Sequence, residues 1–237
     1  MTARAELIKV LTLPATWLTL LGTLFVTVVL DVAFIAAAGQ GQTGSTSALD
    51  VGLASIGYAQ AGFLILGVLT VTSEYGGQVF TSLTAVPRRL ELQVVKGLIL
   101  VAVSIPAAIL MVTVSTLLAR LALPDAAQAG AGELLGAIGG ATVYLALTTL
   151  LAAAVAVAVR RSLPAVALLL GYYFILGPYV RDRTEHASFL PDTAGYSLWF
   201  PGGAEGAPSP AVGFAVVLAW SLVAFAAATA AFVRRDA

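Results

Sequence analysis

The sequence predicts an all-α integral membrane protein with six transmembrane helices. Six long apolar stretches cover residues 13–38, 51–72, 97–118, 134–159, 163–180 and 211–233. A helix needs about 20 residues to cross a hydrocarbon layer of roughly 30 Å, and the fifth stretch, at about 18, is near the lower limit. Charged residues make up 10% of the chain and hydrophobic residues 59%, whereas a soluble domain carries about 25% charged residues.

Cationic residues are the third observation, because they gather on only some of the connections between spans. When the connections are assigned alternately to two sides, one side receives Arg4, Lys9, Arg88, Arg89, Lys96, Arg160, Arg161, Arg234 and Arg235. The other side receives Arg120, Arg181 and Arg183. The positive-inside rule therefore places both termini in the cytoplasm. We expect a single transmembrane domain over residues 1–237.

The first span and the residues before it resemble a signal peptide only superficially. Its apolar run exceeds 20 residues, whereas a signal core has about 7–15, so we expect an uncleaved anchor. Residues 2–12 form an amphipathic pattern that predicts an interfacial helix, with Leu7, Ile8 and Leu11 toward the acyl chains and Arg4, Glu6 and Lys9 toward water. The alternative is a cytoplasmic extension of the first transmembrane helix.

The external connection 181–210 is too apolar for a solvated loop. It contains Phe189, Leu190, Leu198, Trp199 and Phe200. Aromatic rings favour the headgroup level of a bilayer, so we expect short helices that dip into the outer interface.

Motifs of soluble enzymes and metal sites are weak or missing. There is no cysteine, no P-loop motif, no G-x-S-x-G and no H-E-x-x-H. Residues 39–44 match G-x-G-x-x-G, but they follow a membrane helix instead of a strand, so we interpret them as a flexible loop. His186 is the only histidine and predicts no metal site. We expect no catalytic site, cofactor or metal in this chain, and no nucleic-acid partner.

Two features inside the spans invite a structural or a functional interpretation. Gly132, Gly136 and Gly140 recur every fourth residue, which lets helices approach closely, either within the chain or at a dimer seam. Asp31 is the acidic residue closest to the middle of a span, and it points either into a shared cavity or to the outer interface. Because ion-coupled carriers need ionisable groups near the midplane, an ion gradient is not the expected energy source.

The internal connection 73–96 is the strongest functional lead. Glu74 ends the second span, and Gly76 and Gly77 permit a sharp turn. The next residues can form two helical turns with Val79, Phe80 and Leu83 on one side, before Pro87, Arg88, Arg89 and Lys96. Such a short helix fits the groove of a partner protein. The alternative is an ordinary positive-inside loop whose apolar residues lie on the lipid surface.

These residues resemble the permease subunit of ABC-2 type transporters. The similar segments are Gly67–Gly77 with Glu74-Tyr75 near its end, then Leu83-Thr-Ala-Val-Pro87-Arg88-Arg89, and Lys96. Glu6, Lys9, the pair Thr16-Trp17 and the basic end at Arg234-Arg235 are similar to actinobacterial members. Gly77-Gln78 departs from the Gly-Thr that relatives often carry.

The resemblance implies an ABC-2, type V exporter-like fold in a bacterial cell membrane. It implies a cytoplasmic ATP-binding subunit that carries ATP and magnesium, and a second permease, either a copy or a paralogue. It assigns coupling to the ATPase to Glu74, Tyr75, Gly77, Val79, Phe80, Leu83, Arg88 and Arg89, assisted by Glu6 and Lys9 of the interfacial helix. Residues 181–210 would be re-entrant helices that cap the outward exit.

The expected function is ATP-driven export of a hydrophobic or amphipathic substrate, such as a drug, an antimicrobial peptide or a lipid. The alternative from another class is a stand-alone channel or secondary transporter. A membrane-embedded enzyme or assembly factor is the third hypothesis, and activity without any partner would favour it.

Overall fold

The computed structural model describes residues 2–41, 47–73, 89–181, 183–200 and 208–235. Regular structure in these ranges is helical, apart from one isolated β-bridge between Ser47 and Ala127. Within them, six segments are long and apolar enough to cross a membrane: Pro14–Gly39, Ala48–Thr72, Gln93–Ala122, Ala131–Val159, Ser162–Arg181 and Pro210–Ala231. The prediction of an all-helical protein with six segments of spanning length and composition is confirmed.

The chain begins with two helices that meet at a proline. Helix α1 covers Thr2–Thr12 and α2 covers Pro14–Gly39. Proline suits the first turn of α2 because the N–H that it lacks would have no helical partner there. The residues expected to form an interfacial helix are therefore helical and separated from the first span at Leu13.

The second span is broken, which its apolar sequence does not reveal. It consists of α3 (Ala48–Ala54) and α4 (Ile56–Thr72), with Ser55 between them. Gly52 of α3 lies against the backbone of the next long helix, where an added Cβ would come within 2.9 Å of the Thr116 Cα atom. Contact with that helix, and not hydropathy, therefore sets the position of α3.

The third and fourth spans are longer than their apolar cores. Helix α6 covers Arg89–Ala122, so it begins inside the predicted internal connection. Its 34 residues correspond to about 51 Å, more than the hydrocarbon layer requires. Helix α7 covers Ala131–Val159 and ends at Arg160 in the left-handed conformation, with φ of 61°. Arg160 and Arg161 form a tight connection that leads directly into the fifth span.

The fifth span is irregular near the end of the bundle opposite α1. Helix α8 (Ser162–Gly171) continues through a π-helical turn, Tyr172–Leu176, into α9 (Gly177–Arg181). The short helices expected in residues 181–210 are the 3-10 helix η2 (Glu185–Phe189) and α10 (Pro191–Trp199). Helix α11 (Pro210–Arg235) completes the bundle.

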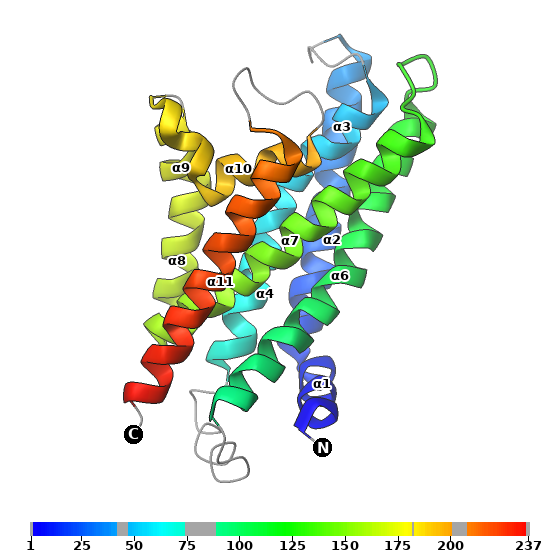
Figure 1. The fold of residues 1–237 in the computed structure, drawn as a ribbon. Coiled ribbons are helices and arrows are strands. Elements are labelled where there is room, and N and C mark those ends of the chain that lie inside the picture. Colours follow the sequence, from blue (N-terminus) through cyan, green and yellow to red (C-terminus); the bar gives the residue numbers. More distant parts are fainter. Residues whose placement is uncertain (1, 42–46, 74–88, 182, 201–207, 236–237) are drawn as a thin grey trace.

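Figure 1 shows the spans as one bundle, with both chain ends and α1 at the same end and with α3, α9 and α10 at the opposite end. An even number of spans places both termini at the same end of the bundle. Helix α7 crosses the centre and packs against α4, α6, α10 and α11. Of the 18 most apolar consecutive residues of α7, 72% are buried, whereas the same share for α2 is 11%. The core therefore lies around α7, and α2 is peripheral.

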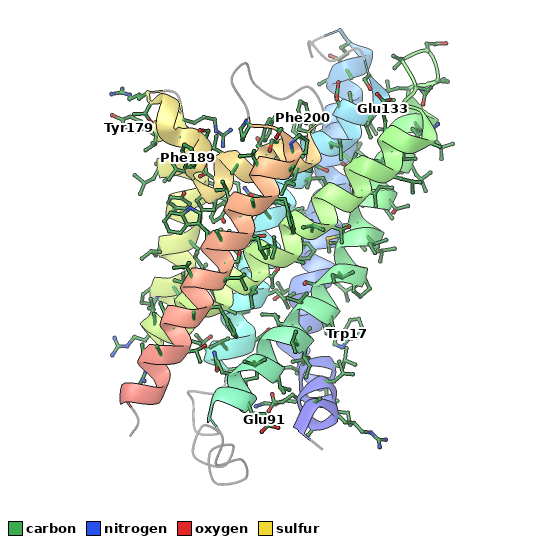
Figure 2. All side chains as sticks on the ribbon, viewed as in Figure 1. Trp17, Glu91, Glu133, Tyr179, Phe189 and Phe200 are labelled. Atoms are coloured by element: carbon green, nitrogen blue, oxygen red, sulfur yellow. The ribbon has the colours of Figure 1, made fainter. Side chains whose placement is uncertain are left out.

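Aromatic side chains lie toward both ends of the bundle. Figure 2 shows Trp17 and Glu91 toward the end that carries α1, and Tyr179, Phe189 and Phe200 toward the opposite end. Trp17, Tyr179 and Phe189 are 50%, 55% and 63% exposed. Exposed aromatic rings at the two ends of an apolar bundle are typical of the two membrane–water interfaces.

Candidate functional site

The predicted coupling segment is bounded by two described helix ends. Helix α4 ends at Thr72 and α6 begins at Arg89, both at the end of the bundle that holds α1. Outside the described residues lie Glu74, Tyr75, Gly77, Val79, Phe80, Leu83 and Arg88, and the structure describes only the backbone of Arg89. Their assignment to coupling stays a prediction, but the connection that carries them leaves and re-enters the bundle beside α1.

The buried side chain of Val10 and a hydrogen bond to the Leu11 carbonyl help to attach helix α1 to the bundle. Val10 is 7% exposed and packs against Ile99 and Val103 of α6. The Trp17 indole N–H in α2 donates to the Leu11 carbonyl at 2.6 Å. Leu7, Ile8 and Leu11 are exposed, as expected for the lipid-facing side of an interfacial helix.

A groove with apolar walls and polar ends lies between α1 and the bundle. Its polar lining comes from α1, from the end of α4 and from the start of α6: Glu6, Lys9, Thr70, Ser73, Gln93 and Lys96. Glu6 and Lys9 are only half-exposed, so they do not lie fully toward water as predicted. They face this groove because Val10 draws the same side of α1 onto α6. Both ends of the predicted coupling segment border the groove.

At the opposite end, α10 is held by a network of polar side chains. The Arg181 guanidinium forms an ion pair with the Asp192 carboxylate at 3.2 Å, and the Tyr172 hydroxyl donates to the same carboxylate at 2.9 Å. Asp192 is 4% exposed, so this ion pair links α9 and the π-helical turn to the buried start of α10. Burial raises the pKa of Tyr196 in α10, and the Arg181 charge opposes that rise.

Glycines allow α10 to approach its neighbours closely. A Cβ atom at Gly140 of α7 would collide with the Leu198 carbonyl, and one at Gly213 of α11 would collide with the Ala194 carbonyl and the Ser197 hydroxyl. A Cβ at Gly177 would meet the Asp192 carboxylate, and one at Gly195 would meet the Tyr144 ring. Helix α10 can therefore approach α7, α9 and α11 closely, because the glycines of these helices carry no side chain at the contacts.

The aromatic residues of α10 lie differently from the prediction. Trp199 is 5% exposed and packs on Tyr144, Tyr196 and Phe200, so its ring faces the bundle core and not the headgroup level. The residue drawn to the interface is Phe189, which is exposed. The indole ring of Trp199 fits the core because Gly195, one turn earlier, leaves room for Tyr144.

The three glycines of α7 do not pack against the same neighbour. Gly140 packs against α10 within the chain, whereas a Cβ at Gly132 or Gly136 would meet no atom within 4 Å. The intrachain interpretation therefore holds for Gly140. For Gly132 and Gly136, the dimer seam stays a prediction.

Asp31 lies inside the bundle and not at the outer surface. Its side chain is 1% exposed, and one carboxylate oxygen, Oδ2, accepts a hydrogen bond of 2.7 Å from the Ser115 hydroxyl of α6. The hydroxyl of Ser55, the residue at the break between α3 and α4, donates in turn to the Ser115 hydroxyl at 3.5 Å. The outer-interface alternative is therefore wrong, because packing against α6 draws the side chain inward.

Compared with known proteins, the chain matches no family model and no curated protein. Among the described residues, no three His, Cys, Asp or Glu side chains gather as a metal site would require. The arrangement thus offers packing, ion-pair and docking features, and these carry the functional argument.

The sequence analysis missed several residues that organise the end of the bundle opposite α1, namely Asp192, Tyr172, Gly177, Gly195 and Gly213. One signal was available: Asp192 follows a proline inside the apolar run Phe189–Phe200, where a lone acidic residue requires a partner. No local pattern identifies Arg181 as that partner, since eleven residues and several turns of chain separate the two.

Proposed function

We propose that the chain is the membrane-spanning permease subunit of an ATP-driven ABC exporter of the ABC-2 type, with both termini in the cytoplasm of a bacterial cell. One observation carries the proposal. The connection with the family-like residues Glu74-Tyr75 and Pro87-Arg88-Arg89 joins α4 to α6 at the end of the bundle that also carries α1 and both termini.

The groove beside α1 supports a mechanical role for this end. A partner that pushes on the connection would act on α4 and α6 directly, and on α1 through the groove that all three line. Because α6 is a continuous helix of 34 residues, a displacement at Arg89 reaches Ala122 at the far end of the bundle. Rigid-body movement of long helices is a known way to convert nucleotide binding into a change of access.

The outer end supports a capped exit. Helix α10 covers the bundle between α7 and α11, and the Arg181–Asp192 ion pair holds it in place. The proposed substrate is hydrophobic or amphipathic, since the exposed face of α2 is largely apolar. Leu18, Leu21 and Phe25 lie on that face. Lipid or a second permease covers this face.

The first test asks whether an ATPase is a partner. A tagged chain purified in mild detergent is expected to bring down a P-loop ATPase subunit whose hydrolysis it stimulates. Charge reversal Glu74→Lys combined with Phe80→Asp is expected to abolish that stimulation and transport while the chain stays in the membrane. A matched control is Asp125→Lys at the opposite end, which should change neither. Transport that survives the double substitution would exclude the coupling role.

The second test asks on which side the connection lies. The chain contains no cysteine, so single-cysteine variants report cleanly on sidedness. A membrane-impermeant thiol reagent applied to intact cells is expected to label Asp125→Cys and to spare Ser73→Cys until the cells are opened. The reverse labelling pattern would place the connection outside and overturn the proposal.

A stand-alone channel or secondary transporter is the second candidate, and Asp31 is the observation that favours it. A buried carboxyl group in a span is a common feature of ion-coupled carriers. Gradient-driven substrate movement in liposomes that contain this chain alone would select this candidate over the exporter.

A further inference from the structure

Asp31 meets two serines where three helices of the bundle come together. It is placed by α2, about 12 Å from the end of that helix at Gly39. The Ser115 hydroxyl of α6 donates to its Oδ2 atom at 2.7 Å, and the Ser55 hydroxyl at the α3–α4 break lies 3.5 Å from the Ser115 hydroxyl. Ser55 and Ser115 are both fully buried. The group is therefore a built polar cluster and not a surface feature.

The other carboxylate oxygen of Asp31 has no hydrogen-bond partner. Oδ1 is buried and no donor reaches it. A carboxylate left charged in such a position costs several kcal/mol, because neither water nor a full set of donors replaces its hydration. Two serine hydroxyls are too few to offset that cost. A bound proton or cation removes it.

The helices around Asp31 supply no positive charge to balance it. Helix α2 packs on α1, α3, α4 and α6. On these elements, the titratable residues closest in sequence to the two serines are Asp50 of α3, Tyr58 of α4 and Arg120 of α6. The Arg120 guanidinium donates instead to Gln128 in the outer connection, at 3.3 Å.

A proton fits this cluster better than a metal cation. Calcium takes 6–8 oxygen ligands and magnesium six, usually with more than one carboxylate or with bound waters. Here one carboxyl group and two hydroxyls converge, and the described residues hold no cluster of acidic side chains. Protonation of one carboxyl oxygen needs no further ligand.

We propose that Asp31, Ser55 and Ser115 form a proton-binding site that is occupied when α2, the α3–α4 break and α6 are packed as in this structure. Loss of the proton places an uncompensated charge at the junction of these helices. By linkage, the packed state binds more protons than the separated state, so raising the pH weakens the junction. The site gives the outer half of the bundle a sensitivity to pH.

Infrared spectroscopy of the full chain in lipid nanodiscs tests the occupancy directly. At neutral pH, the wild-type protein is expected to show the C=O stretching band of a protonated carboxyl group, and Asp31→Asn is expected to lose it. Asp125→Asn is the matched control, because Asp125 is an exposed acidic residue in the outer connection, and this variant should keep the band. A wild-type spectrum without the band, or a band unchanged in Asp31→Asn, would overturn the proposal.

A second variant keeps the test decisive if Asp31→Asn does not fold. Ser115→Ala removes the donor to Oδ2, so the carboxyl band is expected to shift to higher frequency while the rest of the spectrum stays the same. Thermal unfolding should show a melting temperature that falls as the pH rises in the wild type and stays level in Asp31→Asn. Replacement of sodium chloride by choline chloride at fixed pH should change nothing. Stability that depends on sodium would identify a cation site and exclude the proton.

Discussion

Two short α-helices of the described residues, α1 and α10, lie outside the spans at opposite ends of the bundle, and they are held in opposite ways. Helix α10 has nine residues, six of them buried, and glycines on α7, α9 and α11 admit it to the core. Helix α1 has eleven residues, contacts the bundle through Val10 and lines a groove with apolar walls. Few buried apolar contacts mean a low free energy of local opening. The difference indicates that α10 is held rigidly and that α1 is displaceable.

The largest expected effect comes from filling the space that α10 occupies. Gly140→Leu should destabilise the protein by about 3 kcal/mol, because the new side chain collides with the Leu198 backbone and overpacks the α7–α10 contact. Thermal unfolding in detergent measures the loss. Gly136→Leu is the matched control, since nothing lies within 4 Å of its Cβ position and a change below about 0.5 kcal/mol is expected.

The same pair of variants also examines the predicted dimer seam. If Gly136→Leu leaves the monomer stable but dissociates a dimer, the exposed glycines of α7 form an interface between copies. Equal destabilisation by both variants would contradict the separation of Gly140 from Gly136.

A smaller effect is expected from the ion pair at the cap. Asp192→Ala removes the acceptor of both Arg181 and Tyr172 and should cost about 2 kcal/mol, while Asp192→Asn keeps the acceptor for Tyr172 and should cost about 1 kcal/mol. Chemical or thermal unfolding of the two variants gives the order. Asp125→Ala, in the exposed connection between α6 and α7, serves as the control. If the two Asp192 variants were as stable as that control, packing alone would hold α10 in place.

The smallest effect is expected at helix α1. Val10→Ala should lower the free energy of local opening of α1 by about 1 kcal/mol, because it removes two methyl groups from the contact with Ile99 and Val103. Limited proteolysis near the N-terminus should accelerate, while global unfolding changes little. Ile8→Ala, on the 52% exposed face, should leave the proteolysis rate unchanged. A global loss as large as that of Gly140→Leu would mean that α1 belongs to the core.

Hydropathy and charge were enough to predict the coarse fold. Runs such as 134–159 identify a spanning helix because the bilayer requires about 20 apolar residues, whatever their neighbours are. The helical segment 2–12 was also predictable, since its amphipathic pattern and Pro14 are local features. The break at Ser55 was not predictable, because Gly52 meets α6 only after more than sixty residues of chain have folded back.

The candidate functional residues also fall into two groups, those that a local sequence pattern indicates and those that meet only in the folded structure. The connection 73–96 was recognisable from Glu74-Tyr75 and Pro87-Arg88-Arg89, because these residues follow one another along the chain. The cap and the Asp31 cluster were not recognisable, because Arg181 and Asp192, or Asp31 and Ser115, come together only across helices.

The sequence by itself determined that six apolar segments are helical and where their positive flanks lie, since these properties depend on residues next to one another. The tertiary structure decided which polar groups are buried and what they meet. In particular, it turned Asp31 inward and inserted α10 among glycines. The physical reason is that close packing and hydrogen bonding between helices depend on the fit of two surfaces, which no single helix encodes.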